Sequence, residues 1–179
     1  MQKPTRPLLS KFRPQLLKSH QFQGKLNDCG PFAAAIIMNA ILNLDLNGTN
    51  LALGMNHIRW HGLLPVIRRI PKWATFPWGV VDVLRENGLS ANWKCCGQTS
   101  NLFANLLEDK ITIVIVGEWK PLWAHYLVLV EYHPEKGFGF VDTAIPSGLV
   151  VWKRVYDFHR LWKNYGNLFI TVSTTVTPK

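Results

Sequence analysis

Residues 23–38 of this chain read Gln23-Gly-Lys-Leu-Asn-Asp-Cys-Gly-Pro-Phe-Ala-Ala-Ala-Ile-Ile-Met38, and this stretch decides the fold. A helix is expected to begin at Asp28-Cys29-Gly30-Pro31, because Asn and Asp cap helices and proline is favoured at the first helical position. The run from Phe32 to Leu42 is apolar nearly all round. A helix without a polar face is typical of a protein interior, so the sequence predicts a buried central helix that begins at Cys29.

The chain after this helix is expected to form helices first and strands later. Strand-like runs at residues 111–117, 126–132 and 137–142 follow one another, and His133-Pro-Glu-Lys-Gly137 joins the last two as a hairpin turn. Hairpin connections in place of repeated β-α-β units predict an α+β fold with an antiparallel sheet. We also expect an irregular chain over residues 57–78 and further helices at residues 79–87, 99–107 and 156–165.

The composition indicates one folded domain. The chain has 179 residues, of which 47% are hydrophobic and 17% charged, and this excludes an intrinsically disordered protein. Three cysteines exclude a disulfide scaffold. We divide the chain into an extended basic N-terminal arm, residues 1–22, where three prolines argue against a helix, and a single domain, residues 23–179.

The net charge of +9 is compatible with nucleic acid, an anionic surface or solubility alone. No nucleic-acid motif accompanies the basic pairs Arg68-Arg69 and Lys153-Arg154, so we interpret them as solvated surface and expect no nucleic-acid partner. No apolar run approaches the ~18 residues of a membrane span, and the N-terminus has neither the apolar block nor the cleavage site of a secretory signal. We therefore expect a cytoplasmic protein without a membrane span.

Cys29 has the setting of a nucleophile. The macrodipole and the free N–H groups of a helix N-terminus lower the pKa of a thiol placed there. A nucleophilic cysteine needs a base, and His125 stands at the mouth of an apolar strand, where its ring is rigidly mounted. Asp142 ends the next strand of the hairpin and can orient that ring. The candidate donors to an oxyanion are the amide N–H of Cys29 and the side chain of Gln23.

Other conspicuous residues have structural interpretations beside functional ones. Cys95 and Cys96 lack the paired spacing of a zinc site, and we expect them to pack as small hydrophobic side chains. Trp119 and Trp123 either line a substrate groove or pack in the core. No metal and no organic cofactor is expected.

The segment from Gln23 to Met38 resembles the active-site segment of the bacteriocin-processing, double-glycine-leader cysteine peptidases, family thirty-nine of the cysteine peptidases, and of their stand-alone relatives. Residues 125–132 and 137–142 are similar to the second half of that site. The resemblance implies a papain-like fold with Cys29, His125 and Asp142 as the catalytic residues, and Gln23 as the side chain of the oxyanion hole. Asp142 is followed by Thr143, where relatives often have proline.

These residues predict a thiol-dependent hydrolase, a cysteine peptidase that cleaves a peptide or amide bond through an acyl-enzyme on Cys29. Two alternatives remain open: an acyltransferase or amidase that uses the same Cys-His-Asp site, and a non-catalytic peptide-binding module of papain-like fold. Specificity for double-glycine leaders belongs to the transporter-linked members and is not implied for this chain. The identity of the substrate and the oligomeric state also stay open.

Overall fold

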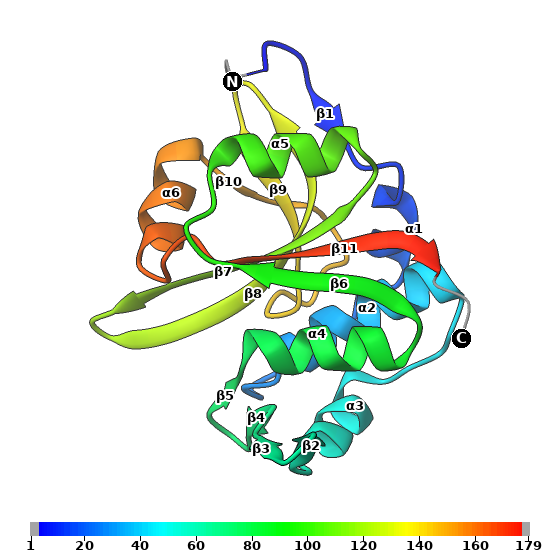
Figure 1. The fold of residues 1–179 in the computed structure, drawn as a ribbon. Helices are drawn as coiled ribbons and strands as arrows, with labels where there is room; N and C mark the ends of the chain where they lie inside the picture. The colour runs from blue at the N-terminus through cyan, green and yellow to red at the C-terminus, as the bar shows by residue number, and fades with distance from the viewer. Residues whose placement is uncertain (1–3, 177–179) are drawn as a thin grey trace.

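The protein is built around one antiparallel sheet. The computed structural model describes residues 4–176. The strands of this sheet are β1 (Leu8–Leu9), β6 (Leu89–Lys94), β7 (Ile111–Trp119), β8 (Leu122–His133), β9 (Gly137–Asp142), β10 (Val151–Lys153) and β11 (Phe169–Val176). Six of them lie in the order β10-β9-β8-β7-β11-β6, and β1 pairs with β8 (Figure 1). The predicted α+β class with an antiparallel sheet is confirmed.

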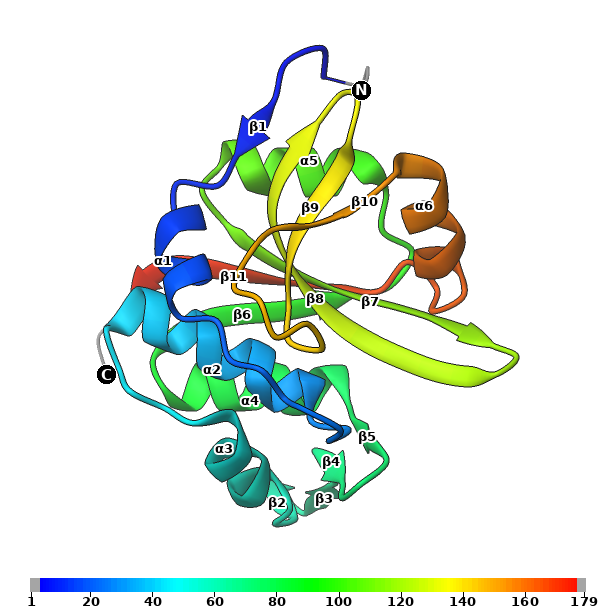
Figure 2. The ribbon, with the colours of Figure 1, turned by 180° about the vertical axis from the view of Figure 1, so that it is seen from behind.

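Helices cover both faces of the sheet (Figures 1 and 2). They are α1 (Arg13–Lys18), α2 (Cys29–Leu42) and α4 (Pro77–Glu86) on one face, and α5 (Thr99–Leu107) and α6 (Val155–Lys163) on the other. Alternate side chains of β7 enter the two cores, Ile113 and Ile115 on the α2 side and Val114 and Val116 on the α6 side. Coverage of both faces explains why residues 113–116 of β7 are all apolar and do not alternate with polar residues.

Helix α2 is buried along most of its length, as the sequence predicts. Residues 30–38 are all buried, and the helix ends where Asn43 takes a left-handed conformation with a φ of 53°. Strand β5 (Ala74–Thr75) crosses the start of α2, and a Cβ on Gly30 would lie 2.9 Å from the Thr75 side chain. Within residues 4–176, neither α2 nor any other helix is long and apolar enough to cross a membrane.

The N-terminal arm is only partly the extended chain that its prolines predict. Residues 13–18 form α1, and Pro14 lies in the first helical turn, where a missing N–H breaks no helical hydrogen bond. Leu16 of this helix has no exposed surface and packs in the core beside α2. Residues 1–3 of the predicted arm lie outside the described residues.

The region expected to be irregular contains two small hairpins next to a helix. They follow α3 (Gly48–Met55) and consist of β2 (Arg59–His61) with β3 (Leu64–Val66), and of β4 (Arg69–Ile70) with β5. The first hairpin carries large apolar side chains on its surface, with Leu63 at its turn 93% exposed. Both hairpins lie at the end of the molecule below α4 in Figure 1.

Arg68 and Arg69 are not the solvated surface that the sequence predicts. Their exposed fractions are 7% and 6%. Arg68 donates to Glu86 of α4 at 2.9 Å, and Arg69 forms an ion pair with Asp28 at the start of α2. A charge is buried in a protein only with such a partner. The two partners lie 18 and 41 residues away in sequence, where no local pattern reveals them.

The packing of α1 predicts a stability difference between two leucines. Leu16→Ala lowers the free energy of unfolding by about 2–5 kcal/mol, because it removes buried methyl groups and leaves a cavity. Leu63→Ala at the exposed hairpin turn changes it by less than about 0.5 kcal/mol. Urea denaturation measures both values. Equal values for the two variants would show that α1 does not pack against the core.

Candidate active site

Cys29 is the first residue of α2 and its side chain is half-buried. Asp28 occupies the N-cap position, and its carbonyl oxygen accepts the Phe32 N–H at 3.0 Å. Among the described residues, the Asp28 carboxylate accepts no hydrogen bond from the first helical turn, in contrast to the capping role that the sequence predicts. The backbone N–H groups of Cys29 and Gly30 therefore receive no bond from that carboxylate.

His125 and Asp142 are brought together by the register of β8 and β9. Asp142 pairs with Leu127, which lies two residues beyond His125 and therefore on the same face of β8. His125 Nε2 donates to Asp142 Oδ1 at 2.7 Å, and the Ala144 N–H donates to the same oxygen at 2.9 Å. The carboxylate is thus held from two directions, and its hydrogen bond fixes the orientation of the ring.

The histidine connects the carboxylate with the thiol. Burial alone lowers the pKa of His125, but hydrogen bonds with Asp142 and Cys29, and the charges of those groups, raise this pKa to about 9. For Asp142, burial raises the pKa, but the bond and charge of His125 and the Ala144 N–H outweigh it, and the pKa is lowered. The raised pKa of His125 and the lowered pKa of Asp142 both favour a charged imidazolium paired with a carboxylate at neutral pH.

Gln23 lies beside this group, and an unexpected residue holds it. The Thr143 hydroxyl donates to Gln23 Oε1 at 2.6 Å, and the Gln23 backbone N–H donates to the Thr143 carbonyl at 2.9 Å. Gln23 Nε2 donates one hydrogen to Leu26 at 2.7 Å, which leaves its second hydrogen for another acceptor. Thr143 therefore holds the Gln23 side chain, a contact that the sequence reasoning missed although Thr143 directly follows Asp142.

A cleft of about 680 Å³ contains all four residues predicted for the site. Its walls include Thr75 of β5 and the indoles of Trp119 and Trp123 on the β7-β8 hairpin. The two tryptophans line the groove and do not pack in the core, since their exposed fractions are 64% and 38%. Trp119 stacks on Tyr165 with the ring centroids 5.5 Å apart, and this contact stiffens the wall.

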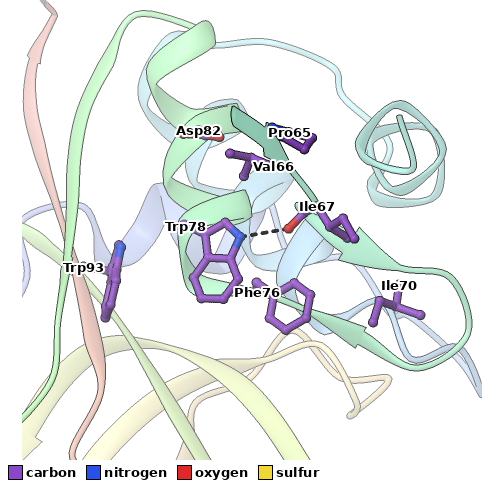
Figure 3. Close-up of a pocket in the computed structure, with 8 residues that line it drawn as sticks. All are labelled: Pro65, Val66, Ile67, Ile70, Phe76, Trp78, Asp82 and Trp93. Carbon is purple, nitrogen blue, oxygen red and sulfur yellow. Dashed lines mark hydrogen bonds between the residues drawn. The ribbon is translucent and has the colours of Figure 1, made fainter. Parts of the chain in front are cut away.

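A second, apolar cavity lies on the other side of β5 and has a volume of about 670 Å³ (Figure 3). Phe76, the residue after β5, stacks on Trp78 with the centroids 4.6 Å apart, and Trp93 lies on the other side of Trp78 with their centroids 6.3 Å apart. The Trp78 indole N–H donates to the Ile67 carbonyl at 2.8 Å, so its polar atom is satisfied. The walls therefore offer almost purely apolar surface next to the cleft.

Cys95 and Cys96 do not pack as the sequence predicts. Both are exposed free thiols in the turn between β6 and α5. Cys96 has a positive φ of 58°, and its N–H donates to the Gly166 carbonyl at 2.8 Å. The backbone of this turn is anchored while the thiols face outward, which makes them internal controls for thiol reactivity.

Comparison with solved structures gives the fold its class. Neither a family model nor a curated protein sequence matches the chain. A Bacillus anthracis protein described as a C39-like peptidase superposes with a TM-score of 0.69 at 11% identity, covering 96% of this chain and 100% of that one. The fold is that of C39-like peptidase domains.

Two transporter-linked domains have the same fold. The peptidase domain of Streptococcus ComA, a bifunctional ABC transporter involved in quorum sensing, has a TM-score of 0.59 at 19% identity, with 82% of this chain and 91% of that one covered. A double-glycine motif protease of an AMS/PCAT transporter, solved in complex with a leader peptide, has a TM-score of 0.57 at 12% identity over 86% and 89%. At these identities the likeness establishes the fold.

The raised pKa of His125 predicts where its ring titrates. The ring keeps its proton at neutral pH and loses it near pH 9, because Asp142 and Cys29 favour the charged form. NMR of the labelled imidazole measures the midpoint. Asp142→Asn lowers the midpoint, whereas Asp157→Asn, which alters an exposed pair with Arg154, leaves it unchanged. A midpoint of about 6.5 in the unaltered protein would contradict the geometry.

Proposed function

We propose that this chain is a cysteine peptidase of papain-like fold, which cleaves a peptide or amide bond through an acyl-enzyme on Cys29. One arrangement carries the proposal: the thiol at the start of a buried helix is close enough to His125 to raise the pKa of that ring, and Asp142 holds the ring by a hydrogen bond. Cys29, His125 and Asp142 come from three separate elements and line one cleft, which supports their proposed roles as nucleophile, base and orienting carboxylate. This is the arrangement that acyl transfer through a thiol requires.

The proposed reaction begins from a thiolate and an imidazolium. The Cys29 sulfur attacks the substrate carbonyl carbon, and the resulting tetrahedral oxyanion collapses with loss of the amine. The charged His125 donates its proton to the departing nitrogen, which its raised pKa permits at neutral pH. Neutral His125 then takes a proton from water, which attacks the thioester and releases the acid. Asp142 holds the ring in one orientation throughout, and no metal or organic cofactor takes part.

The oxyanion is stabilised by two donors in this proposal. They are the backbone N–H of Cys29 and the second hydrogen of Gln23 Nε2. Support comes from the way Thr143 fixes the Gln23 amide: its hydroxyl bonds Oε1, so Nε2 is the atom that remains for donation. The side chain is only 9% exposed, and a donor of this kind costs little reorganisation when the transition state forms.

A peptide is the proposed substrate. The cleft is long enough to involve the β7-β8 hairpin on one side and β5 on the other, and the transporter-linked neighbour was solved with a peptide bound. The apolar cavity across β5 supports a peptide with large apolar side chains, because it would remove them from water.

Thiol labelling tests the proposed nucleophile. Iodoacetamide modifies Cys29 faster than Cys95 and Cys96, although Cys29 is half-buried and the other two are exposed. Accessibility alone predicts the opposite order. Peptide mapping by mass spectrometry measures the three rates, and a peptide library, with Cys29→Ala as the control, then identifies cleaved bonds. Slower labelling at Cys29 than at the other two thiols would remove the main support for the peptidase proposal. Products formed with an added amine would distinguish acyl transfer from hydrolysis.

Gln23→Ala separates oxyanion stabilisation from nucleophile activation. We expect kcat to fall by ~10²–10³ while the alkylation rate of Cys29 changes little, since alkylation forms no oxyanion. The matched control is Gln21→Ala: this amide bonds the backbone of Leu46 and Gly48, so its loss affects stability and not kcat. Equal losses of kcat in the two variants would contradict the assignment.

A further inference from the structure

A second buried ion pair lies directly beside the proposed nucleophile. Asp28, the residue before Cys29, is 6% exposed, and its carboxylate is paired with the guanidinium of Arg69 from β4. The pair joins residues separated by 41 positions. It is not part of the proposed reaction, and its carboxylate belongs to the residue directly before Cys29.

Arg69 is held in place by more than its anion. Its Nη1 donates to Asn56 Oδ1, directly after α3, at 2.6 Å and to the carbonyl of Ala52 within α3 at 3.2 Å. The guanidinium therefore joins α3, the β4-β5 hairpin and the start of α2. A buried arginine with several fixed partners cannot move away from its carboxylate without losing all of them.

The electrostatic consequence falls on Cys29. A carboxylate at an N-cap would ordinarily bond the first-turn N–H groups, and its negative charge would disfavour a thiolate one residue away. Here Asp28 turns to Arg69 instead, and makes no such bond in the described structure. The N–H groups and the positive end of the helix are thereby left for the sulfur.

We propose that Arg69 is a positioning residue for Cys29: it neutralises Asp28 and holds its carboxylate away from the first turn of α2, so that the helix N-terminus stabilises the thiolate. This inference rests on the proposed nucleophilic role of Cys29 and adds the residue that protects it from its own neighbour. The β4-β5 hairpin thus contributes to the reactivity of the thiol without touching the substrate carbonyl.

Several other charged or titratable groups surround the thiol. His125 and Tyr126 face it from β8, and Asp142 follows from β9 through its bond to His125. Lys153 of β10 lines the same cleft. A substitution at Arg69 replaces none of these groups. A change in the reactivity of Cys29 in such a variant therefore reports on the charge of Asp28.

The test is the pH dependence of Cys29 alkylation in a Cys95→Ser, Cys96→Ser background, where one thiol remains. Arg69→Met leaves the Asp28 charge without its partner, and the midpoint of the alkylation profile rises by about one pH unit. Asp28→Asn leaves the positive charge, and the midpoint falls. The double variant carries neither charge, and its midpoint returns close to that of the parent.

A merely structural role predicts a different pattern. Arg68→Met is the matched control, because it removes a neighbouring buried arginine whose partner, Glu86, lies on α4 and not beside the thiol. This variant loses thermal stability without a shift of the midpoint. If Arg69→Met does not fold, the downward shift in Asp28→Asn and its reversal in Arg69→Met, Asp28→Asn still decide the question. Arg69→Lys keeps the positive charge, so its alkylation midpoint lies much closer to that of the parent than the midpoint of Arg69→Met does.

The outcomes separate the two proposals. A fast-reacting Cys29 whose midpoint is the same in the parent, Arg69→Met and Asp28→Asn would overturn the role of Arg69 and leave the peptidase proposal standing. A parent Cys29 that reacts no faster than the surface thiols would overturn both. Circular dichroism and thermal melting of every variant ensure that folded protein is compared.

Discussion

Helix α2 packs against the sheet, α1, α3 and α4 with hardly any polar surface of its own, and the remaining structure depends on this contact. Because its core side chains are fully buried, the helix can neither rotate nor slide without opening cavities. Its first residue, Cys29, is consequently held at a fixed position relative to β8. The sheet fixes the other half of the site through the register that sets Asp142 against Leu127. Hydrophobic packing and strand pairing together bring the proposed nucleophile to its base.

Two charge pairs involve residues around Cys29, and in the proposals above both favour its thiolate. In these proposals His125, paired with Asp142, carries a positive charge next to the sulfur, and Arg69 neutralises the negative charge of Asp28. Buried ion pairs contribute little net stability, since desolvation offsets their attraction. Their presence at this place therefore supports the proposed thiol chemistry more than it explains the stability of the fold.

The β4-β5 hairpin, for which the sequence predicts only irregular chain, connects the cleft with the neighbouring apolar cavity. The β4-β5 hairpin supplies Arg69 to the start of α2, Thr75 to the cleft and, one residue later, Phe76 to the apolar cavity. Tyr126, next to His125, donates its hydroxyl to the Thr75 carbonyl at 2.8 Å and fixes the hairpin to the sheet. One short segment thereby shapes the cleft, its charge and its apolar extension.

The sequence by itself determined the elements whose signals are local. The start and apolar run of α2, the β8-β9 hairpin and the antiparallel class follow from patterns within a few residues, as do the positions of Cys29, His125 and Asp142. Only the tertiary structure decided the burial of Arg68 and Arg69, the helix within the N-terminal arm, the exposure of Cys95 and Cys96, and the bond from Thr143 to Gln23. These depend on partners up to 120 positions apart, and the choice between solvent and a distant partner is made by packing, which no local pattern encodes.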